Sequence, residues 1–212
     1  WLAGDVLVVN DPFLGGTHLP DVTVISPCFL EQELIGFVAN RAHHANIGAA
    51  TPGSMPIATT LAEEGLVIPP TFLYRGGERQ AEAWRQLQSL EGSDVEGDFA
   101  AQVSANRLGI QRLGQVISQR GLAGFRQAVR EMNDYGERLA RNTLGQLPPG
   151  RYAFEDQMDD DGTGHQDIPI RVSLALSSEG IEVDFTGTAD QVKGNIKDRK
   201  STRLNSSHQI IS

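Results

Sequence analysis

The sequence predicts an α+β fold with a mixed β-sheet region, a central helical segment and antiparallel strands near the end of the chain. Short apolar runs bounded by glycine and proline dominate the first third, as they do in β-strands. Apolar residues recur at helical spacing in the middle third, and alternation of apolar and polar residues follows near the end. Strands, then helices, then strands again favour an α+β or a mixed α/β architecture.

The first third is predicted to hold three strands. Residues 6–9 are an apolar run typical of a buried strand. Residues 21–25 and 33–39 predict two more strands, the first of which we expect Pro27 to end. Residues 41–60 are rich in glycine and proline and predict a long loop, which in a compact domain is usually functional or disordered.

The middle of the chain is predicted to be helical. A first helix is expected over residues 79–90, and a second over 98–119, with Asp98 as its N-cap. Gly121 stands where a glycine commonly ends a helix. A third helix should then continue to the Pro-Pro-Gly sequence that begins at Pro148.

The final part returns to strands, which we place at 151–154, 168–176 and 181–185. The chain starts at Trp1 directly before a strand, so we expect further sequence upstream. We interpret residues 1–197 as one partial domain. Residues 198–212 are polar, basic and without period, so we expect a non-native, adapter-derived tail, with a genuine flexible tail as the alternative.

Composition excludes several classes of function. The net charge is −9 and the pI is about 5.0, so an acidic surface should repel nucleic acids and anionic lipids. No apolar run approaches the roughly 20 residues that a membrane-spanning helix needs. Cys28 is the single cysteine, which excludes an internal disulfide. We therefore expect a cytoplasmic protein without nucleic-acid or membrane partners.

Two segments carry residues suited to metal binding. In the first, His18 and Asp21 lie three residues apart at the entry to a strand, after the glycine pair 15–16 that lets the backbone turn tightly. Imidazole nitrogens and carboxylate oxygens are ordinary ligands for zinc, manganese or iron. In the second segment, His43 and His44 follow a strand, and adjacent side chains diverge, so only one should bind the same ion. The alternative for each histidine is a hydrogen-bonded structural residue.

The same segments carry a family resemblance. Residues 10–23 (NDPFLGGTHLPDVT) and 37–44 (FVANRAHH) resemble the signatures of the hydantoinase B/oxoprolinase family. Shorter matches follow in the expected order at residues 52–56, 64–70, 105–107 and 184–188. The family subunit is much longer than this chain, so the resemblance identifies an interior piece of its N-terminal half.

The resemblance implies a metal-dependent hydrolase of cyclic amides such as 5-oxoproline or hydantoin-like rings. It places the metal ligands at His18, Asp21 and His43, for one divalent ion of zinc, manganese or iron, with a further carboxylate ligand upstream of the chain. An A-type partner subunit or domain would bind ATP and magnesium and activate the substrate. A ketone carboxylase subunit of the same family is the alternative, and an inactive fragment that only binds metal or has a structural role is another.

Two further residues are candidates for proton transfer or for orienting the ligands, namely His44 and Asp11. Each has a structural alternative, since Asn-Asp-Pro forms turns and a histidine can be satisfied within the core. Many relatives carry aspartate where this chain has Asn46, and an amide cannot accept a proton at neutral pH.

Other features are not expected to carry chemistry. Residues 157–168 fail the calcium-loop pattern, because Gln157 and Ile168 occupy its first and last ligand positions, so we expect a solvated turn with His165 exposed. Cys28 is expected to be an inert thiol. No phosphate-binding loop is present, so ATP is not expected to bind to this chain.

Overall fold

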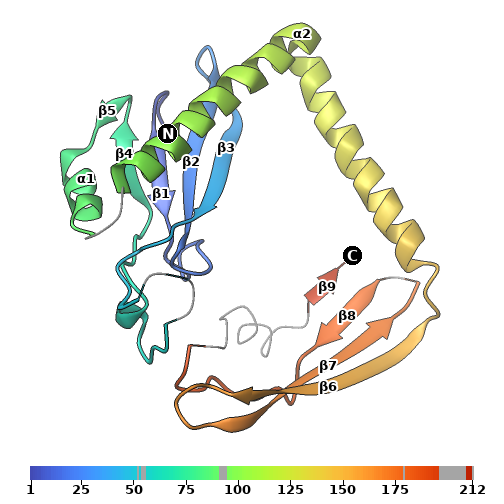
Figure 1. Ribbon diagram of the computed structural model, residues 1–212. Helices are drawn as coiled ribbons and strands as arrows, with labels where there is room; N and C mark the ends of the chain where they lie inside the picture. Colours follow the sequence, from blue (N-terminus) through green and yellow to red (C-terminus); the bar gives the residue numbers. More distant parts are fainter. Residues whose placement is uncertain (52, 54–55, 91–94, 179, 196–208, 212) are drawn as a thin grey trace. The chain divides into compact units, whose positions relative to one another are not determined.

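A computed structural model describes residues 1–51, 53, 56–90, 95–178, 180–195 and 209–211 (Figure 1). The chain divides into two compact units, Trp1–Phe125 and Arg126–Ser212, which are described separately below. Both units combine helix with β-sheet, so the predicted α+β class is confirmed. Among the described residues, no helix combines the length and apolar character required to cross a lipid bilayer.

The first unit contains a five-stranded sheet in the order β3-β2-β1-β4-β5. Its neighbouring strands all pair antiparallel, which corrects the expectation of a mixed sheet. The strands are β1 (Val6–Val9), β2 (Asp21–Leu30), β3 (Glu33–His43), β4 (Thr71–Arg75) and β5 (Glu78–Arg79). A short 3-10 helix, η1, spans Leu61–Glu63.

The predicted ends of two strands were wrong. Strand β2 continues through Pro27 to Leu30, because β1 pairs only with Thr23, Val24 and Ile25 and leaves that side of β2 open at the proline. A missing N–H is tolerated where no neighbouring strand needs it. Strand β3 extends to His43, so the loop begins later than expected; residues 52, 54 and 55 of that loop lie outside the described part.

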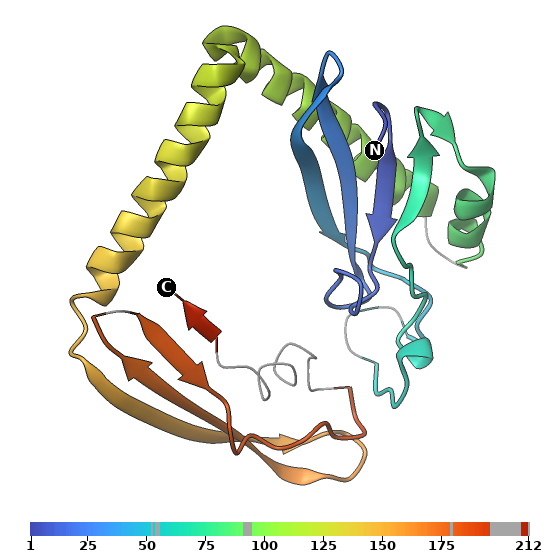
Figure 2. The same cartoon turned by 180° about the vertical axis from the view of Figure 1, so that it is seen from behind.

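Two helices complete the first unit, α1 (Ala81–Gln88) and the beginning of α2 (Val95–Leu144). Helix α2 starts before Asp98, so this residue lies in the first turn and is not the expected cap. Gly121 has φ 69° and ψ 155°, a conformation that interrupts the helix where the sequence predicted a break. The first part of α2 lies in front of the sheet in Figure 1 and behind it in Figure 2, so it covers one face.

The core of this unit lies between that face and the helices. Val22 and Val24 of β2 are fully buried, whereas the alternate residues Asp21, Thr23 and Ile25 remain partly exposed. This alternation is the period of two that a sheet with one covered face requires. The helices contribute buried apolar side chains to the core, namely Trp84 and Leu87 from α1 and Phe99 and Val103 from α2. The other face of β2 and β3 is therefore available for a site.

The second unit contains the end of α2 and a four-stranded antiparallel sheet in the order β6-β7-β8-β9. Its strands are β6 (Gly150–Asp160), β7 (Gln166–Leu176), β8 (Ile181–Asp184) and β9 (Gln209–Ile211). The first three confirm the predicted C-terminal strands. Strand β9 lies in the part of the chain interpreted as a tail, an interpretation that stays a prediction.

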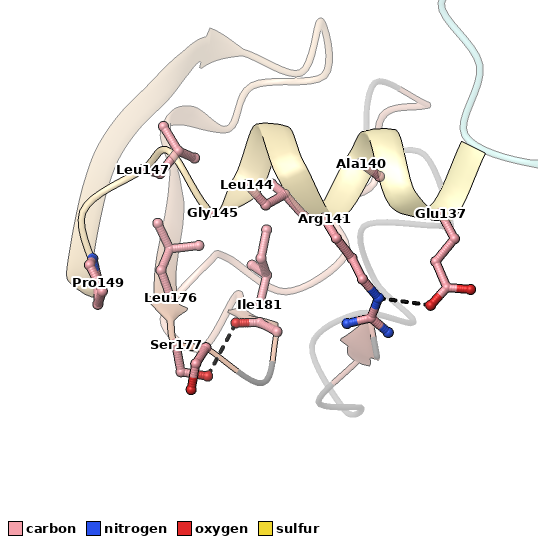
Figure 3. A pocket seen from close by; sticks show the side chains of 12 residues that line it. Glu137, Ala140, Arg141, Leu144, Gly145, Leu147, Pro149, Leu176, Ser177 and Ile181 are labelled. Carbon is pink, nitrogen blue, oxygen red and sulfur yellow. Dashed lines mark hydrogen bonds and ion pairs between the residues drawn. The ribbon is translucent and has the colours of Figure 1, made fainter. Parts of the chain in front are cut away.

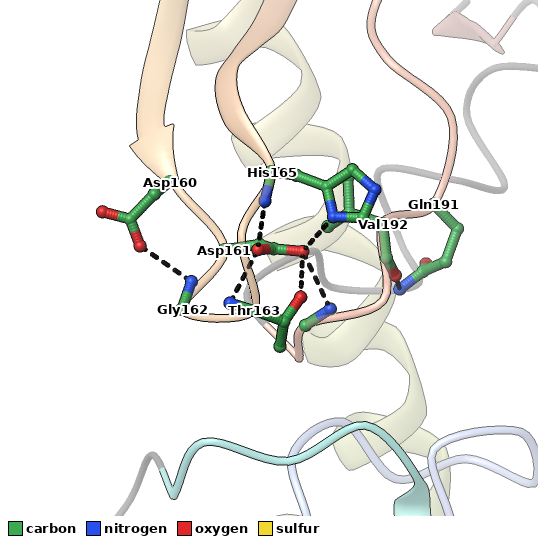
Figure 4. A network of polar contacts seen from close by, with 8 residues as sticks. Asp160, Asp161, Gly162, Thr163, His165, Gln191 and Val192 are labelled. Carbon is green, nitrogen blue, oxygen red and sulfur yellow. Dashed lines mark hydrogen bonds and ion pairs between the residues drawn. The ribbon is translucent and has the colours of Figure 1, made fainter.

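The turn between β6 and β7 is built around a buried carboxylate. Asp161 is 1% exposed and accepts hydrogen bonds from Thr163, His165 and the backbone N–H of Gly194 (Figure 4). Burial raises the pKa of Asp161, but these hydrogen bonds outweigh it and hold the pKa well below its usual range. The expected solvated turn is thus corrected: His165 is exposed as predicted, but Asp161 is an internal anchor.

Candidate functional site

The loop that carries His18 is fixed by Asn10, which lies at the end of β1 and is fully buried. The Asn10 side chain donates from Nδ2 to the carbonyls of Leu19 and Leu66, at 2.8 and 2.9 Å, and accepts from the N–H of Ile68 at 2.6 Å. These bonds tie residues 11–20 to the segment before β4. Sequence reasoning treated Asn10 only as turn punctuation and missed this role.

A close approach of the backbone brings the loop back toward β1. A Cβ atom added to Gly16 would lie 2.0 Å from the carbonyl oxygen of Asn10, so only glycine fits there. The N–H of Gly16 also donates to the carbonyl of Asp11 at 2.7 Å. The glycine pair therefore closes the loop tightly and delivers the chain to His18, as the sequence predicted.

The three predicted metal ligands lie close together at one end of the sheet. Asp21 and His43 are register partners in the first pair of the β2–β3 ladder, and His43 Nδ1 lies 2.8 Å from Asp21 Oδ1. Their side chains are 30% and 44% exposed, which makes both accessible to solvent. The ring of His18 lies 5.7 Å from the ring of His43, measured between centroids.

His18 provides the observation that bears most directly on a ligand. Among the described residues, its Nε2 is buried and has no hydrogen-bond partner. A buried polar atom without a partner is costly and calls for an explanation, such as an ion that the nitrogen would bind. No three histidine, cysteine, aspartate or glutamate side chains among the described residues already form a cage for an ion. The donor types and the unpartnered nitrogen fit a divalent cation, but the ligands are not preorganised as a set.

His44 points away from this group and into the core. It is 4% exposed, its Nε2 lies 2.9 Å from Gln102 Oε1, and its ring packs on Phe99 of α2. Gln102 uses Nε2 to donate to the Val22 carbonyl and to Asn40 Oδ1, so its Oε1 must accept, and His44 Nε2 carries the hydrogen. The two adjacent histidines thus diverge, as the sequence predicted.

Asp11 and Asn46 both form local turns. Asp11 Oδ1 accepts from the N–H of Phe13 at 2.7 Å, and Asn46 Oδ1 accepts from the N–H of Gly48 at 2.8 Å. Such side-chain bonds to the backbone two residues later are the usual reason for these residue types in turns. Cys28 is buried, and burial raises the pKa of its thiol, as expected for an inert cysteine.

A separate cavity of about 490 Å³ lies within the second unit (Figure 3). Apolar side chains from the end of α2 and from β7 and β8 line it, with the Glu137–Arg141 ion pair at its edge. Its apolar lining residues are Ala140, Leu144, Leu147, Leu176 and Ile181. Sequence reasoning gave no sign of it, since its walls come from segments that only the fold brings together.

Residues 1–206 match the family model described as hydantoinase B/oxoprolinase. The chain belongs to this family. A protein from Pseudomonas sp. (strain NS671), named as one subunit of a putative D-/L-hydantoinase, is 36% identical over 197 residues, covering 89% of this chain. The present chain therefore spans about a third of the length of that relative, since the match covers 33% of it.

Solved structures support the same assignment. The crystal structure of an ATP-dependent caprolactamase from Pseudomonas jessenii has a TM-score of 0.87 at 26% identity, covering 96% of this chain and 35% of the other. A nucleotide-free acetone carboxylase has a TM-score of 0.83 at 19% identity, covering 95% of this chain and 29% of the other, which is a likeness of fold alone. The hydantoinase B/oxoprolinase fold is therefore shared by proteins named for different reactions.

Proposed function

We propose that this chain is the metal-binding part of an ATP-dependent hydrolase that opens a cyclic amide, either 5-oxoproline or a hydantoin-like ring. The observation that carries the proposal is the grouping of His18, Asp21 and His43 on the accessible end of the sheet. The family description and the names of the hydantoinase and caprolactamase relatives support a cyclic amide as the substrate class.

His18, Asp21 and His43 would hold one divalent ion of zinc, manganese or iron, and the unpartnered Nε2 of His18 supports this assignment. When bound, such an ion lowers the pKa of a bound water and stabilises negative charge on an oxygen.

The protein's own residues orient this group. His43 Nδ1 and Asp21 Oδ1 lie 2.8 Å apart, so the two side chains converge at the end of the β2–β3 ladder. The backbone N–H of His44 donates to the Pro20 carbonyl at 2.8 Å, which ties the end of β3 to the turn that carries His18 and Asp21. The contacts of His44 with Pro20 and Gln102 favour a positioning role for that residue. Proton transfer by His44 or Asp11 stays a prediction.

An A-type partner subunit or domain is proposed to bind ATP and magnesium and to phosphorylate the amide oxygen. An amide carbon is a poor electrophile. Phosphorylation of the amide oxygen makes that carbon susceptible to attack by water. The hydantoinase relative is named as one subunit of its enzyme, and the caprolactamase is named as ATP-dependent, which supports a two-part enzyme.

The test uses the full-length B-type component together with its A-type partner, with and without ATP. We expect ATP-dependent ring opening of 5-oxoproline or hydantoin, and no fixation of bicarbonate onto acetone. The His18→Ala variant should lose both activity and bound metal, measured by elemental analysis. Fixation of bicarbonate would establish the carboxylase alternative, and equal metal content in variant and wild type would remove the metal site. Metal retained without any activity would favour a binding or structural piece.

A further inference from the structure

Arg41 lies beside the Asp21–His43 pair on the accessible face of the sheet. In the β2–β3 ladder Arg41 is the partner of Thr23, two positions from the pair formed by Asp21 and His43. Side chains two residues apart on a strand point to the same side of a sheet. The guanidinium group therefore shares its face with the candidate site, while Val22 and Val24 point into the core.

Two threonines fix the orientation of this guanidinium. Arg41 Nε donates to Thr23 Oγ1 at 2.9 Å, and Arg41 Nη1 donates to Thr17 Oγ1 at 3.1 Å. The Thr17 hydroxyl in turn donates to Asp21 Oδ2 at 3.4 Å. Because each threonine hydroxyl is neutral, these hydrogen bonds hold Arg41 in place without balancing its positive charge.

The charge of Arg41 is unbalanced by any ion pair within the described residues. Three other arginines of the same unit each pair with a carboxylate, Arg75 with Asp5, Arg79 with Glu96 and Arg85 with Glu82. A guanidinium has five N–H donors, of which the threonines use two, so three are left for a ligand. An exposed, oriented arginine of this kind suits two-point binding of a planar or tetrahedral oxyanion.

We propose that Arg41, positioned by Thr17 and Thr23, binds an oxyanion group of the ligand while the reacting centre lies at His43 and Asp21. This inference rests on the proposed function and adds that the group bound beside the reacting centre is anionic. The oxyanion has two possible sources with the same chemistry: a carboxylate carried by the ring, as in 5-oxoproline, or the phosphoryl group added during activation.

Three probes separate these sources when their binding to the full 212-residue chain is measured by calorimetry or NMR. They are 5-oxoproline, its neutral analogue 2-pyrrolidinone, and inorganic phosphate. Arg41→Gln should weaken 5-oxoproline binding about tenfold or more if the carboxylate is the ligand, and leave 2-pyrrolidinone unchanged. If the phosphoryl group is the ligand, phosphate binding alone should fall by about that factor.

Matched variants define what each result means. Arg41→Lys should retain part of the anion affinity, because lysine keeps the positive charge but lacks the two parallel N–H donors of the guanidinium. Arg112→Gln removes an exposed arginine from α2 that also donates to a neutral partner, Gln115, and should change nothing. Metal content and melting temperature are measured for every variant.

Either of two results overturns the proposal: wild-type chain that binds neither anion, or Arg41→Gln that binds both anions as wild type does. Loss of metal together with anion binding in Arg41→Gln also overturns it, since Arg41 would then only support Asp21 and His43. Failure of ATP-dependent ring opening in the full-length enzyme would contradict the proposed function and leave the anion measurement intact, so the two failures are distinguishable.

Discussion

The two units each contain an aspartate bonded to a histidine Nδ1, and the two pairs serve different ends. Asp21 and His43 are 2.8 Å apart, and Asp161 and His165 are 3.0 Å apart. Asp21 is 30% exposed, and besides His43 it receives one long hydroxyl bond, from Thr17. Asp161 has a fully buried side chain and accepts four further hydrogen bonds.

An Asp–His contact therefore does not by itself indicate a functional site. Whether the carboxylate can bind a ligand depends on how many hydrogen bonds it already accepts within the fold. Asp161 uses its oxygens to join a turn to the backbone at Gly194, where an added Cβ would lie 2.1 Å from the Asp161 carbonyl oxygen. Asp21 keeps accessible acceptor capacity and contacts His43, whose ring lies 5.7 Å from that of His18 between centroids. The first pair is suited to binding, and the second to holding the fold.

The largest expected difference is in catalysis. Asp21→Asn should lower metal affinity and ring-opening activity of the full-length enzyme by about a hundredfold or more, because an amide is a poor metal ligand. His165→Ala should leave both unchanged. Metal content by elemental analysis and steady-state turnover check this prediction. Equal effects of the two substitutions would erase the proposed division between the pairs.

Gln102→Leu tests whether His44 belongs with the fold or with the site. The substitution removes the hydrogen-bond partner of His44 Nε2 and one donor each from the Val22 carbonyl and Asn40 Oδ1. We expect the free energy of unfolding to fall by about 2 kcal/mol, as for buried polar groups left unsatisfied. Denaturant unfolding measures this, with Gln115→Leu on the exposed side of α2 as the control. An unchanged stability would contradict the core role of this network.

Asp161→Asn should lower the melting temperature of the chain by several degrees at neutral pH, because the amide cannot accept all the bonds that the carboxylate accepts. Asp21→Asn should have a smaller effect, since Asp21 is partly exposed and less engaged. Calorimetry of both variants provides the comparison. A larger destabilisation by Asp21→Asn would reverse the assignment of the two pairs.

The pH dependence of stability follows from the lowered pKa of Asp161. A carboxyl with a lower pKa in the folded state stabilises the fold at pH values above its unfolded pKa, about 4. This contribution is lost as the pH falls through the folded pKa. The stability difference between wild type and Asp161→Asn should thus be constant from about pH 5 to 7 and shrink below about pH 4. A difference that grows in acid would refute this account.

The smallest effect is expected for His165→Ala. The His165 side chain is 51% exposed, and the backbone N–H of the same residue continues to donate to Asp161. A contact made by a histidine ring that is half-exposed contributes less than about 1 kcal/mol to stability. Thermal melts at pH 7 check it, and a loss as large as that of Asp161→Asn would show that the ring is the main partner of the carboxylate.

Much of the local structure was predictable because local residue chemistry decides it. The apolar run of β1, the break at Gly121 and the divergence of His43 from His44 were all confirmed. The end of β2 was missed because tolerance of Pro27 depends on which neighbouring strand is present there. Strands β4 and β5 were missed too, since their pairing joins residues distant in sequence.

The residues of the candidate site could be named in part from the sequence, and their role as metal ligands stays a prediction. His18, Asp21 and His43 could be named because of their residue types and their resemblance to a family signature. The role of Asn10 could have been found only by asking which polar side chain would satisfy the backbone of the loop. Gln102 gave no signal, because a glutamine on a helix is ordinarily exposed and its partners lie on a strand 80 residues earlier.

The sequence alone was enough to predict most of the helices and strands, the residue types suited to metal binding, and the family to which the chain belongs. These follow from periodicity, side-chain chemistry and motif order along the chain. The sequence did not reveal that Asp21 faces His43 across two strands, that Arg41 shares their face, or that Asp161 is an anchor. Those outcomes depend on register and burial, which are set by contacts between residues far apart in the sequence.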